Sequence, residues 1–320
     1  MLKLTGKNAD LMMARLKSWH LKDANGVEGD SLTLSINSTD IDGIPPKGEQ
    51  YTVYLGDVKR DIFQIAQRSA TLRPSEVQLV LTVAPFLANQ SEFLKRQSAS
   101  WDQVKLAQII SDTITPFGYD VFVHPRLAKI EIEHCDRTDE SASAFLNRLA
   151  KQFDAYAKPV ERLYVFVPMG EAKSISGKQI ETITFTEPTD KQPNVVNVSA
   201  ELDGRNGFNG VKAYYVTTQD GTRQEVSLGS SPFKQLGKDK NSKSEATQAA
   251  AAELRRLQRQ GRKLTITATP NPKAFAEGLF VLDATFPRAF QGHCSIDEVE
   301  FSGQGLQPNQ MTIHATLTGD

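Results

Sequence analysis

Residues 244–303, SEATQAAAAELRRLQRQGRKLTITATPNPKAFAEGLFVLDATFPRAFQGHCSIDEVEFSG, carry the strongest structural signals in the chain. The segment opens with an Ala-rich helical pattern that is expected to end at Gly261, and its apolar stripe consists of Ala246, Ala250, Leu254 and Leu257. Strand patterns follow at residues 264–269, 279–284, 294–301 and 311–317. A helix set among strands predicts a mainly β domain with a helical insertion near residues 242–262.

Strand and helix patterns alternate through the rest of the chain. Short strand-like runs fill the N-terminal part at 15–21, 31–36, 51–55, 62–72 and 77–83. Helical periodicity is expected from Val104 to Phe117, and again from Ala142 to Phe153 after a cap at Thr138 or Asp139. The fold class predicted is α+β, mainly β. We expect a first β domain at 1–95, built as an antiparallel sandwich or barrel, an α/β insertion domain at 96–170, and a second β domain at 171–320 that includes a hairpin turning at Gly221.

Composition excludes several classes of protein. The 37 basic and 38 acidic residues give a formal net charge of -1, so no general attraction to nucleic acid or to an anionic membrane is expected. Two cysteines, Cys135 and Cys294, are too few for a disulfide framework. No run is apolar enough for a signal peptide or a membrane-spanning helix, which predicts synthesis and folding in a reducing cytoplasm.

Two patterns resemble phosphate or metal sites but depart from what that chemistry requires. Residues 170–178, GEAKSISGK, separate their glycines by six residues where a phosphate loop needs four, and Gln179 replaces the hydroxyl residue that would hold magnesium. His134-Cys135 and His293-Cys294 offer soft ligands, but adjacent residues on a strand face opposite ways and no C-x-x-C spacing accompanies them. We therefore predict no metal, no cofactor and no catalytic residues.

A basic stripe is the one candidate site on the helix of residues 244–261. Arg255, Arg259 and Arg262 recur at i, i+4 and i+7 and so share one face near the helix C-terminus. One interpretation is a solvated face that complements the helix dipole, and the other is a patch that contacts phosphates or a partner.

Three segments together resemble the phage late control D family, the tail hub proteins of contractile phages. Residues 23–56 look like the opening of the family, with a strand, a Pro-Pro-x-Gly turn and a second strand. Residues 100–168 are similar to its middle unit, with matching residues at Ile132, His134, Asp136, Thr138, Glu140, Phe145, Leu146 and Leu149. The third segment is 244–303, with Gly278, Val299 and Gly303 at its recognisable points and Phe301 where a His is expected.

The resemblance implies that both β domains are barrel-like. It also implies a structural and non-enzymatic role in the virion tail baseplate or in a tailocin particle, after assembly in the host cytoplasm. It implies a homotrimer related in design to the N-terminal part of the VgrG spike, whose two barrels per subunit present pseudo-sixfold symmetry to a hexameric tail tube and threefold symmetry to a trimeric spike. The implied partners are therefore other copies of the chain, the tail tube protein, the spike, the tape measure protein, other baseplate proteins, and DNA where the basic stripe faces the lumen.

Two further expectations concern surfaces. Glu298 and Glu300 share one face of a predicted strand, so a hub that also acts as a cell-wall hydrolase through paired acids remains the alternative. Contacts between barrels are expected to leave a strand edge paired across subunits, and residues 312–315 are the first candidate edge.

Overall fold

The computed structural model describes residues 1–24, 30–41, 43–83, 93, 95–160, 163–169, 181–187, 195–201, 207–217, 221–259 and 263–317. Packing divides the chain into two compact units. Unit 1 contains residues 1–87, 178–200 and 264–315, and unit 2 contains 88–177, 201–263 and 316–320. The domains expected at 1–95, 96–170 and 171–320 remain a prediction. The two packed units each combine segments that are separated in the sequence.

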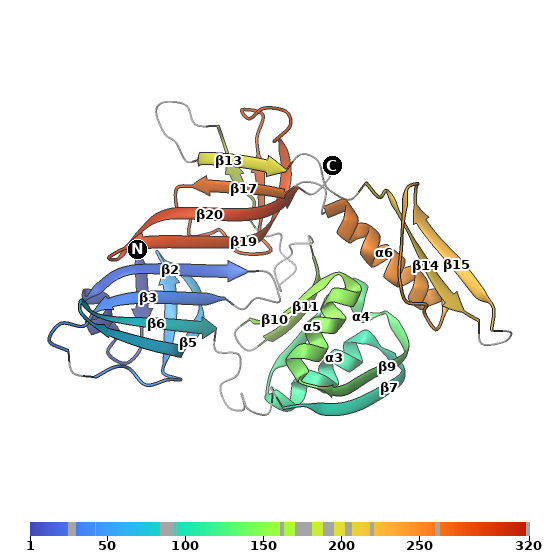
Figure 1. The fold of residues 1–320 in the computed structure, drawn as a ribbon, viewed down its shortest axis with the longest axis horizontal. Coiled ribbons are helices and arrows are strands. Elements are labelled where there is room, and N and C mark those ends of the chain that lie inside the picture. The colour runs from blue at the N-terminus through green and yellow to red at the C-terminus, as the bar shows by residue number, and fades with distance from the viewer. Residues whose placement is uncertain are drawn as a thin grey trace. The chain divides into compact units, whose positions relative to one another are not determined.

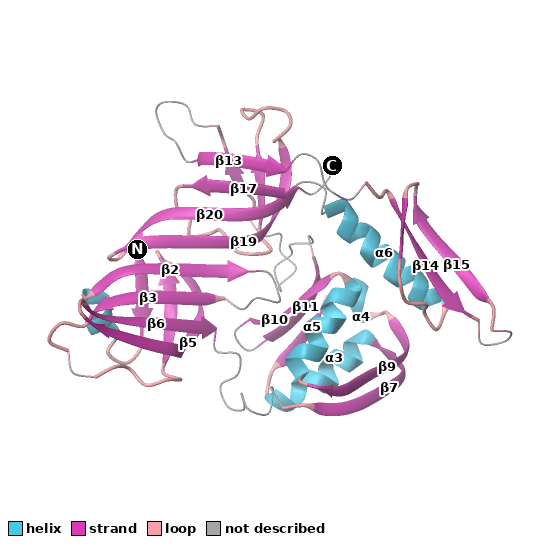
Figure 2. Cartoon of the chain, in the orientation of Figure 1, coloured by secondary structure: helices cyan, strands magenta, loops and turns pink. Residues whose placement is uncertain are grey.

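The first half of unit 1 is an antiparallel set of strands with one short helix, α1 (Ala9–Ala14). Alternating buried and exposed positions define its strands, which are β1 (Leu2–Thr5), β2 (Leu16–Ala24), β3 (Ser31–Asn37), β4 (Gln50–Leu55), β5 (Val58–Leu72) and β6 (Ser75–Val83). They pair in the order β1-β4-β5-β6-β3-β2. The expected β character of this region is therefore confirmed (Figure 2).

The second half of unit 1 continues the same sheet. Its strands are β12 (Ile183–Phe185), β13 (Val195–Glu201), β17 (Lys263–Ala268), β18 (Leu279–Leu282), β19 (Gly292–Gln304) and β20 (Gln307–Leu317). β19 pairs antiparallel with β2 from Glu298↔Ala24 to Gln304↔Ser18, which makes one twelve-stranded sheet. Figure 1 shows the blue β2 and the red β19 side by side. The two predicted β regions thus share one sheet. The sequence did not predict this, because a pairing between segments so far apart in the chain leaves no local pattern.

Gly303 is required at the join between β2 and β19. A Cβ atom at this position would collide with the indole ring of Trp19 and with the Gln307 carbonyl oxygen. Trp19 is 3% exposed, so its ring has no free space into which it could move. The close approach of backbone and ring explains why only glycine fits here.

A buried arginine links β5 to the segment between β17 and β18. The Arg60 guanidinium donates to the carbonyl oxygens of Ala274 at 2.8 Å and Pro272 at 3.0 Å, and it lies 3.5 Å from Asp23 Oδ2. Its Cζ is 4.2 Å from the ring centroid of Phe275 and 4.8 Å from that of Phe301. Phe301, which stands where the family resemblance led us to expect a His, therefore supplies a ring face to this cation.

The middle of the chain forms the α/β part of unit 2. Its elements are β7 (Gln97–Lys105), α3 (Leu106–Ile114), a 3₁₀ turn (Thr115–Phe117), β8 (Asp120–Val123), α4 (Pro125–Ala128), β9 (Glu131–Glu140), α5 (Ala142–Phe153), β10 (Ala155–Val160) and β11 (Leu163–Pro168). Strand order is β10-β11-β8 in one sheet and β7-β9 in another. Both expected helices are present, but the cap of α5 is Ser141, whose Oγ accepts from the Ala144 amide at 3.1 Å, and not Thr138 or Asp139, which lie in β9.

A second part of unit 2 surrounds the Ala-rich helix. It contains β14 (Gly210–Val216), β15 (Arg223–Gly229), β16 (Phe233–Gln235) and α6 (Lys243–Arg259), with strand order β15-β14-β16. Ala246, Ala250 and Leu257 of the expected stripe are buried against Val211 and Ala213, and Leu254 is partly buried there. The hairpin β14–β15 thus packs on α6 in a sheet of its own, and its expected place in the second barrel was wrong.

Candidate functional site

The residues that could support chemistry are dispersed among the described residues. No group of three or more His, Cys, Asp or Glu side chains there is placed to hold a metal ion. Cys294 lies in unit 1 and Cys135 in unit 2, both are buried free thiols, and burial raises the pKa of Cys294 to about 12. No described helix is long and apolar enough to cross a membrane. Residues 170–178 lie outside the described residues.

Each of the two acids of the hydrolase alternative contacts a basic side chain of the neighbouring strand. Glu298 Oε2 lies 2.9 Å from Lys22 Nζ, and Glu300 Oε2 lies 3.4 Å from His20 Nε2. Both basic side chains come from β2, whose register with β19 sets Lys22 opposite Glu300 and His20 opposite Ser302, so both contacts run diagonally across the ladder. The ion pair between Lys22 and Glu298 stabilises the strand pair, as opposite charges on neighbouring strands do.

The basic stripe is only partly visible. Arg255 extends from α6 toward the C-terminus of α5, where its Nε lies 3.6 Å from Asp154 Oδ2. The Asp154 side chain is only 4% exposed, and that of Arg255 is 35% exposed. The side chain of Arg259 and all of Arg262 lie outside the described residues. Arg255 therefore has a structural partner within unit 2, and a shared face for all three arginines stays a prediction.

A charged cluster joins β7 and β9 on the surface of unit 2. His134 Nδ1 lies 2.6 Å from Asp102 Oδ1, and His134 Nε2 lies 2.9 Å from Asp136 Oδ2. These hydrogen bonds raise the pKa of His134, and the bond from His134 helps to lower the pKa of Asp136. His134, at a position that resembles the hub family, thus links β9 to β7 through Asp102, and Asp136 holds the second nitrogen of its ring.

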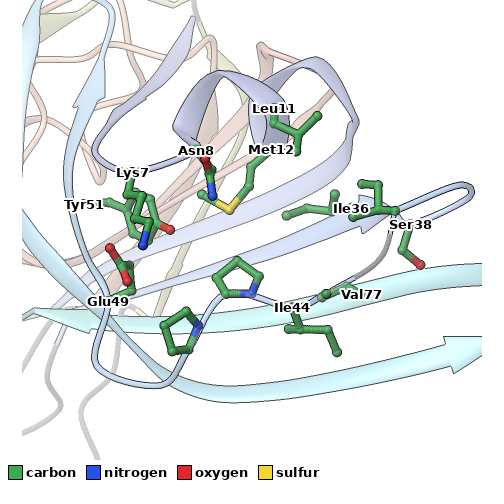
Figure 3. Close-up of a pocket in the computed structure, with 14 residues that line it drawn as sticks. Lys7, Asn8, Leu11, Met12, Ile36, Ser38, Ile44, Glu49, Tyr51 and Val77 are labelled. Atoms are coloured by element: carbon green, nitrogen blue, oxygen red, sulfur yellow. The ribbon is translucent and has the colours of Figure 1, made fainter.

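An apolar pocket of about 240 Å³ lies beside α1 in unit 1. Figure 3 shows Met12 and Leu11 of α1 on one side and Ile44 on the other, with Lys7 and Glu49 close to Tyr51. Leu11 is 48% exposed and Ile44 is 39% exposed, so the rim as well as the floor is apolar. Burial, with a smaller contribution from the Glu49 carboxylate, raises the pKa of Tyr51. The Pro-Pro turn of the sequence contributes Pro45 and Pro46 to the wall.

β13 is the strand at one end of the sheet of unit 1, and the strand that contains residues 312–315 is not at an end. β20 lies between β19 and β17, so the expected edge was wrong, whereas β13 ends the described strand order after β17. Val196 on β13 is 73% exposed. A second pocket, of about 270 Å³, adjoins this strand, and its apolar wall consists of Val195, Val196, Val198, Phe286, Pro287 and Phe290. The local sequence pattern predicted a strand at residues 311–317 but carried no information on the order of strands in the sheet. The edge at β13 was therefore not predicted.

Exposed strand edges and apolar pockets are features of proteins that assemble into larger complexes, and the known proteins that this chain is similar to are components of such complexes. The chain is 28% identical over 222 residues to the "Probable baseplate hub protein" of Escherichia phage P2, in an alignment covering 68% of this chain and 54% of that protein. The chain thus spans about half the length of this curated relative.

Two solved structures share the fold. The 43 kDa tail protein of prophage MuSo2 from Shewanella oneidensis superposes with a TM-score of 0.70 at 12% identity, covering 98% of this chain and 97% of that one. The E. coli c3393 protein, a type VI secretion component described as similar to the T4 tail proteins gp27 and gp5, gives 0.64 at 9% identity, covering 100% of this chain and 77% of that one. The family model of the phage tail baseplate hub (GPD) matches residues 29–307, and the chain therefore belongs to the phage tail baseplate hub family.

Proposed function

We propose that this protein is the structural hub of a contractile tail baseplate, in a phage or in a tailocin, and that it adapts a hexameric tail tube to a trimeric spike. The proposal is supported by the family match over residues 29–307 and by the fold shared with tail proteins over nearly the whole chain. The single observation on the molecule that carries it is the exposed edge strand β13 with its adjoining apolar pocket. Such an edge is a template for pairing with another chain.

The proposed partners are other copies of the chain, the tube and spike proteins, the tape measure protein and other baseplate proteins. A homotrimer with two β regions per subunit offers six similar surfaces to the tube and three to the spike. The mainly β architecture with separate exposed edges suits these roles, because interfaces of this kind are built from backbone pairing and apolar contact.

For the basic stripe of Arg255, Arg259 and Arg262, we propose that it faces the lumen of the hub ring and contacts DNA there. Reversal of Arg255 would bring a second carboxylate to the buried Asp154, so the change would disturb folding as well as any lumen. The informative variant therefore keeps Arg255 and changes Arg259→Glu and Arg262→Glu. Particles should assemble normally and deliver less DNA, and normal infectivity of these particles would contradict the lumen role.

The hub proposal is tested by locating the chain in particles. Tails purified from a producing strain should contain the protein at the end that carries the spike, and loss of its gene should abolish assembled tails. Tails that assemble without the protein would contradict the proposal. For the hydrolase alternative, a zymogram on peptidoglycan is expected to show no clearing by the purified chain.

A further inference from the structure

β13 presents an open edge with a pocket beside it. Its one described neighbour in the sheet is β17, so its other flank carries main-chain groups without a described partner strand. Val195 is 2% exposed and faces the core, while Val196 on the opposite face is 73% exposed. The pocket next to these residues has the Phe286 and Phe290 rings in its wall. An added strand would find hydrogen-bonding groups and an apolar recess for one side chain.

The outer half of β5 is a second open edge on the same chain. β4 pairs with β5 only from Leu55↔Val58 to Gln50↔Gln64, and the Ile65 amide donates to the Glu49 carbonyl oxygen at 3.0 Å. Residues 67–72 continue beyond that point, all of them exposed, with only β6 as their described partner strand. Leu72 at the tip is 86% exposed, the most of any large apolar side chain described. An apolar side chain this exposed suggests a contact made only in an assembly.

The two edges complement each other in charge. The stretch from residue 67 to 73, QRSATLR, carries two arginines and no acid. β13 and the lining of its pocket carry Glu187 and Glu201 and no lysine or arginine. Within unit 1 the strands β6, β3, β2, β19, β20 and β17 lie between β5 and β13, which Figure 1 shows on opposite sides of the sheet, so the two edges of one copy do not meet. Different patches that pair between copies make a head-to-tail contact, which forms a closed ring when the rotation between successive copies is a whole fraction of a turn, one third for a trimer.

We propose that the outer half of β5 of one copy adds antiparallel to β13 of the next copy and places Leu72 against Val196 in the pocket of Phe286 and Phe290. This contact rests on the proposed hub function and supplies the interface that closes its trimer. It differs from a twofold contact, in which each edge would pair with the same edge of the other copy.

Cysteine pairs test the contact in assembled particles. A chain with both Leu72→Cys and Val196→Cys, incorporated into tails and oxidised, should give a covalent ladder on denaturing gels that ends at three chains. Leu72→Cys alone and Val196→Cys alone should remain monomeric. The matched control chain carries Leu72→Cys together with Val216→Cys, at a valine on β14 that is 39% exposed, and should give no ladder. Absence of the ladder in assembled tails, or cross-links in the single variants, would overturn the contact while leaving the hub role intact.

A second variant covers the case in which the cysteine chains do not assemble. Leu72→Asp, co-expressed with the natural chain, should be incorporated into tails at least about tenfold less often, which corresponds to about 1.4 kcal/mol. Val216→Asp is the control and should compete normally. Equal incorporation of Leu72→Asp would overturn the contact, whereas tails that contain neither chain would count against the hub function itself.

Discussion

Replacement of Arg60 by alanine should destabilise unit 1 selectively. The Arg60 side chain is 3% exposed and that of Asp23 is 10% exposed. Without the guanidinium, the Asp23 carboxylate keeps the hydrogen bond from the Ala276 amide at 3.3 Å but loses its buried countercharge. Two carbonyl oxygens, of Pro272 and Ala274, lose their donor in the same step. Burial lowers the pKa of Arg60 to about 10 and Asp23 partly offsets this, so the group stays charged at neutral pH.

The expected loss of stability follows from the buried ion pair and its hydrogen bonds. Removing one partner of such a pair costs about 3–5 kcal/mol, because it leaves an uncompensated charge in the interior. Loss of the cation–π contacts with Phe275 and Phe301 falls within that range and adds no separate amount. Arg60→Lys should recover only part of the loss, since an ammonium cannot reach both carbonyl oxygens in the planar geometry of a guanidinium.

The two free thiols report on each unit separately. Cys294 is fully buried in unit 1 and Cys135 is 9% exposed in unit 2, so labelling of each requires its own unit to open. A loss of 3 kcal/mol should speed the labelling of Cys294 by about 100-fold, because each 1.4 kcal/mol is tenfold, while Cys135 should be unaffected. Arg68→Ala, on the exposed half of the same strand, is the control. A change below about fivefold at Cys294 would refute the reasoning.

Three further outcomes are expected. Hydrogen bonds raise the pKa of His134 in the folded protein, so its contribution to stability is full below the unfolded pKa of about 6.5 and is lost as pH rises through the folded pKa. The urea midpoint of unit 2 should therefore fall over this pH range, and His134→Gln should remove the pH dependence. Asn197→Pro should reduce incorporation into tails more than it reduces the melting temperature, because proline removes a main-chain donor from β13, a strand at the edge of its sheet. Equal loss of both would contradict an interface role. Arg255→Ala should destabilise unit 2 by about 1–3 kcal/mol through the buried Asp154, measured by Cys135 labelling, and unchanged labelling would contradict it.

Local elements of this fold are predictable from sequence because their causes are local. The helices α3, α5 and α6 follow from apolar periodicity, and the β5–β6 hairpin follows from two strand patterns around Arg73-Pro74. The β7 strand was missed because its residues are mostly exposed and lack alternation, so nothing but its pairing with β9 defines it. α1 was missed because six residues are too few to show helical periodicity.

Long-range features were not predictable. The join of β2 to β19, the Arg60 contacts with residues 272–275 and the outer position of β13 all depend on segments far apart in sequence, for which a single chain gives no pairing signal. Gly278 and Gly303, two points of the family resemblance, carried part of this information. Each lies where a Cβ atom would collide with another segment or with nearby backbone, so a glycine there marks a close approach without naming the partner.

The copy number of this chain in an intact baseplate tests the central claim most directly. Structure determination of purified tails by electron cryomicroscopy, without imposed symmetry, would count the copies around the tail axis and show which strands meet. The trimeric hub predicts three copies in a closed ring, with β13 of each copy against the outer half of β5 of the next. A ring of six copies, or a dimer, would contradict it.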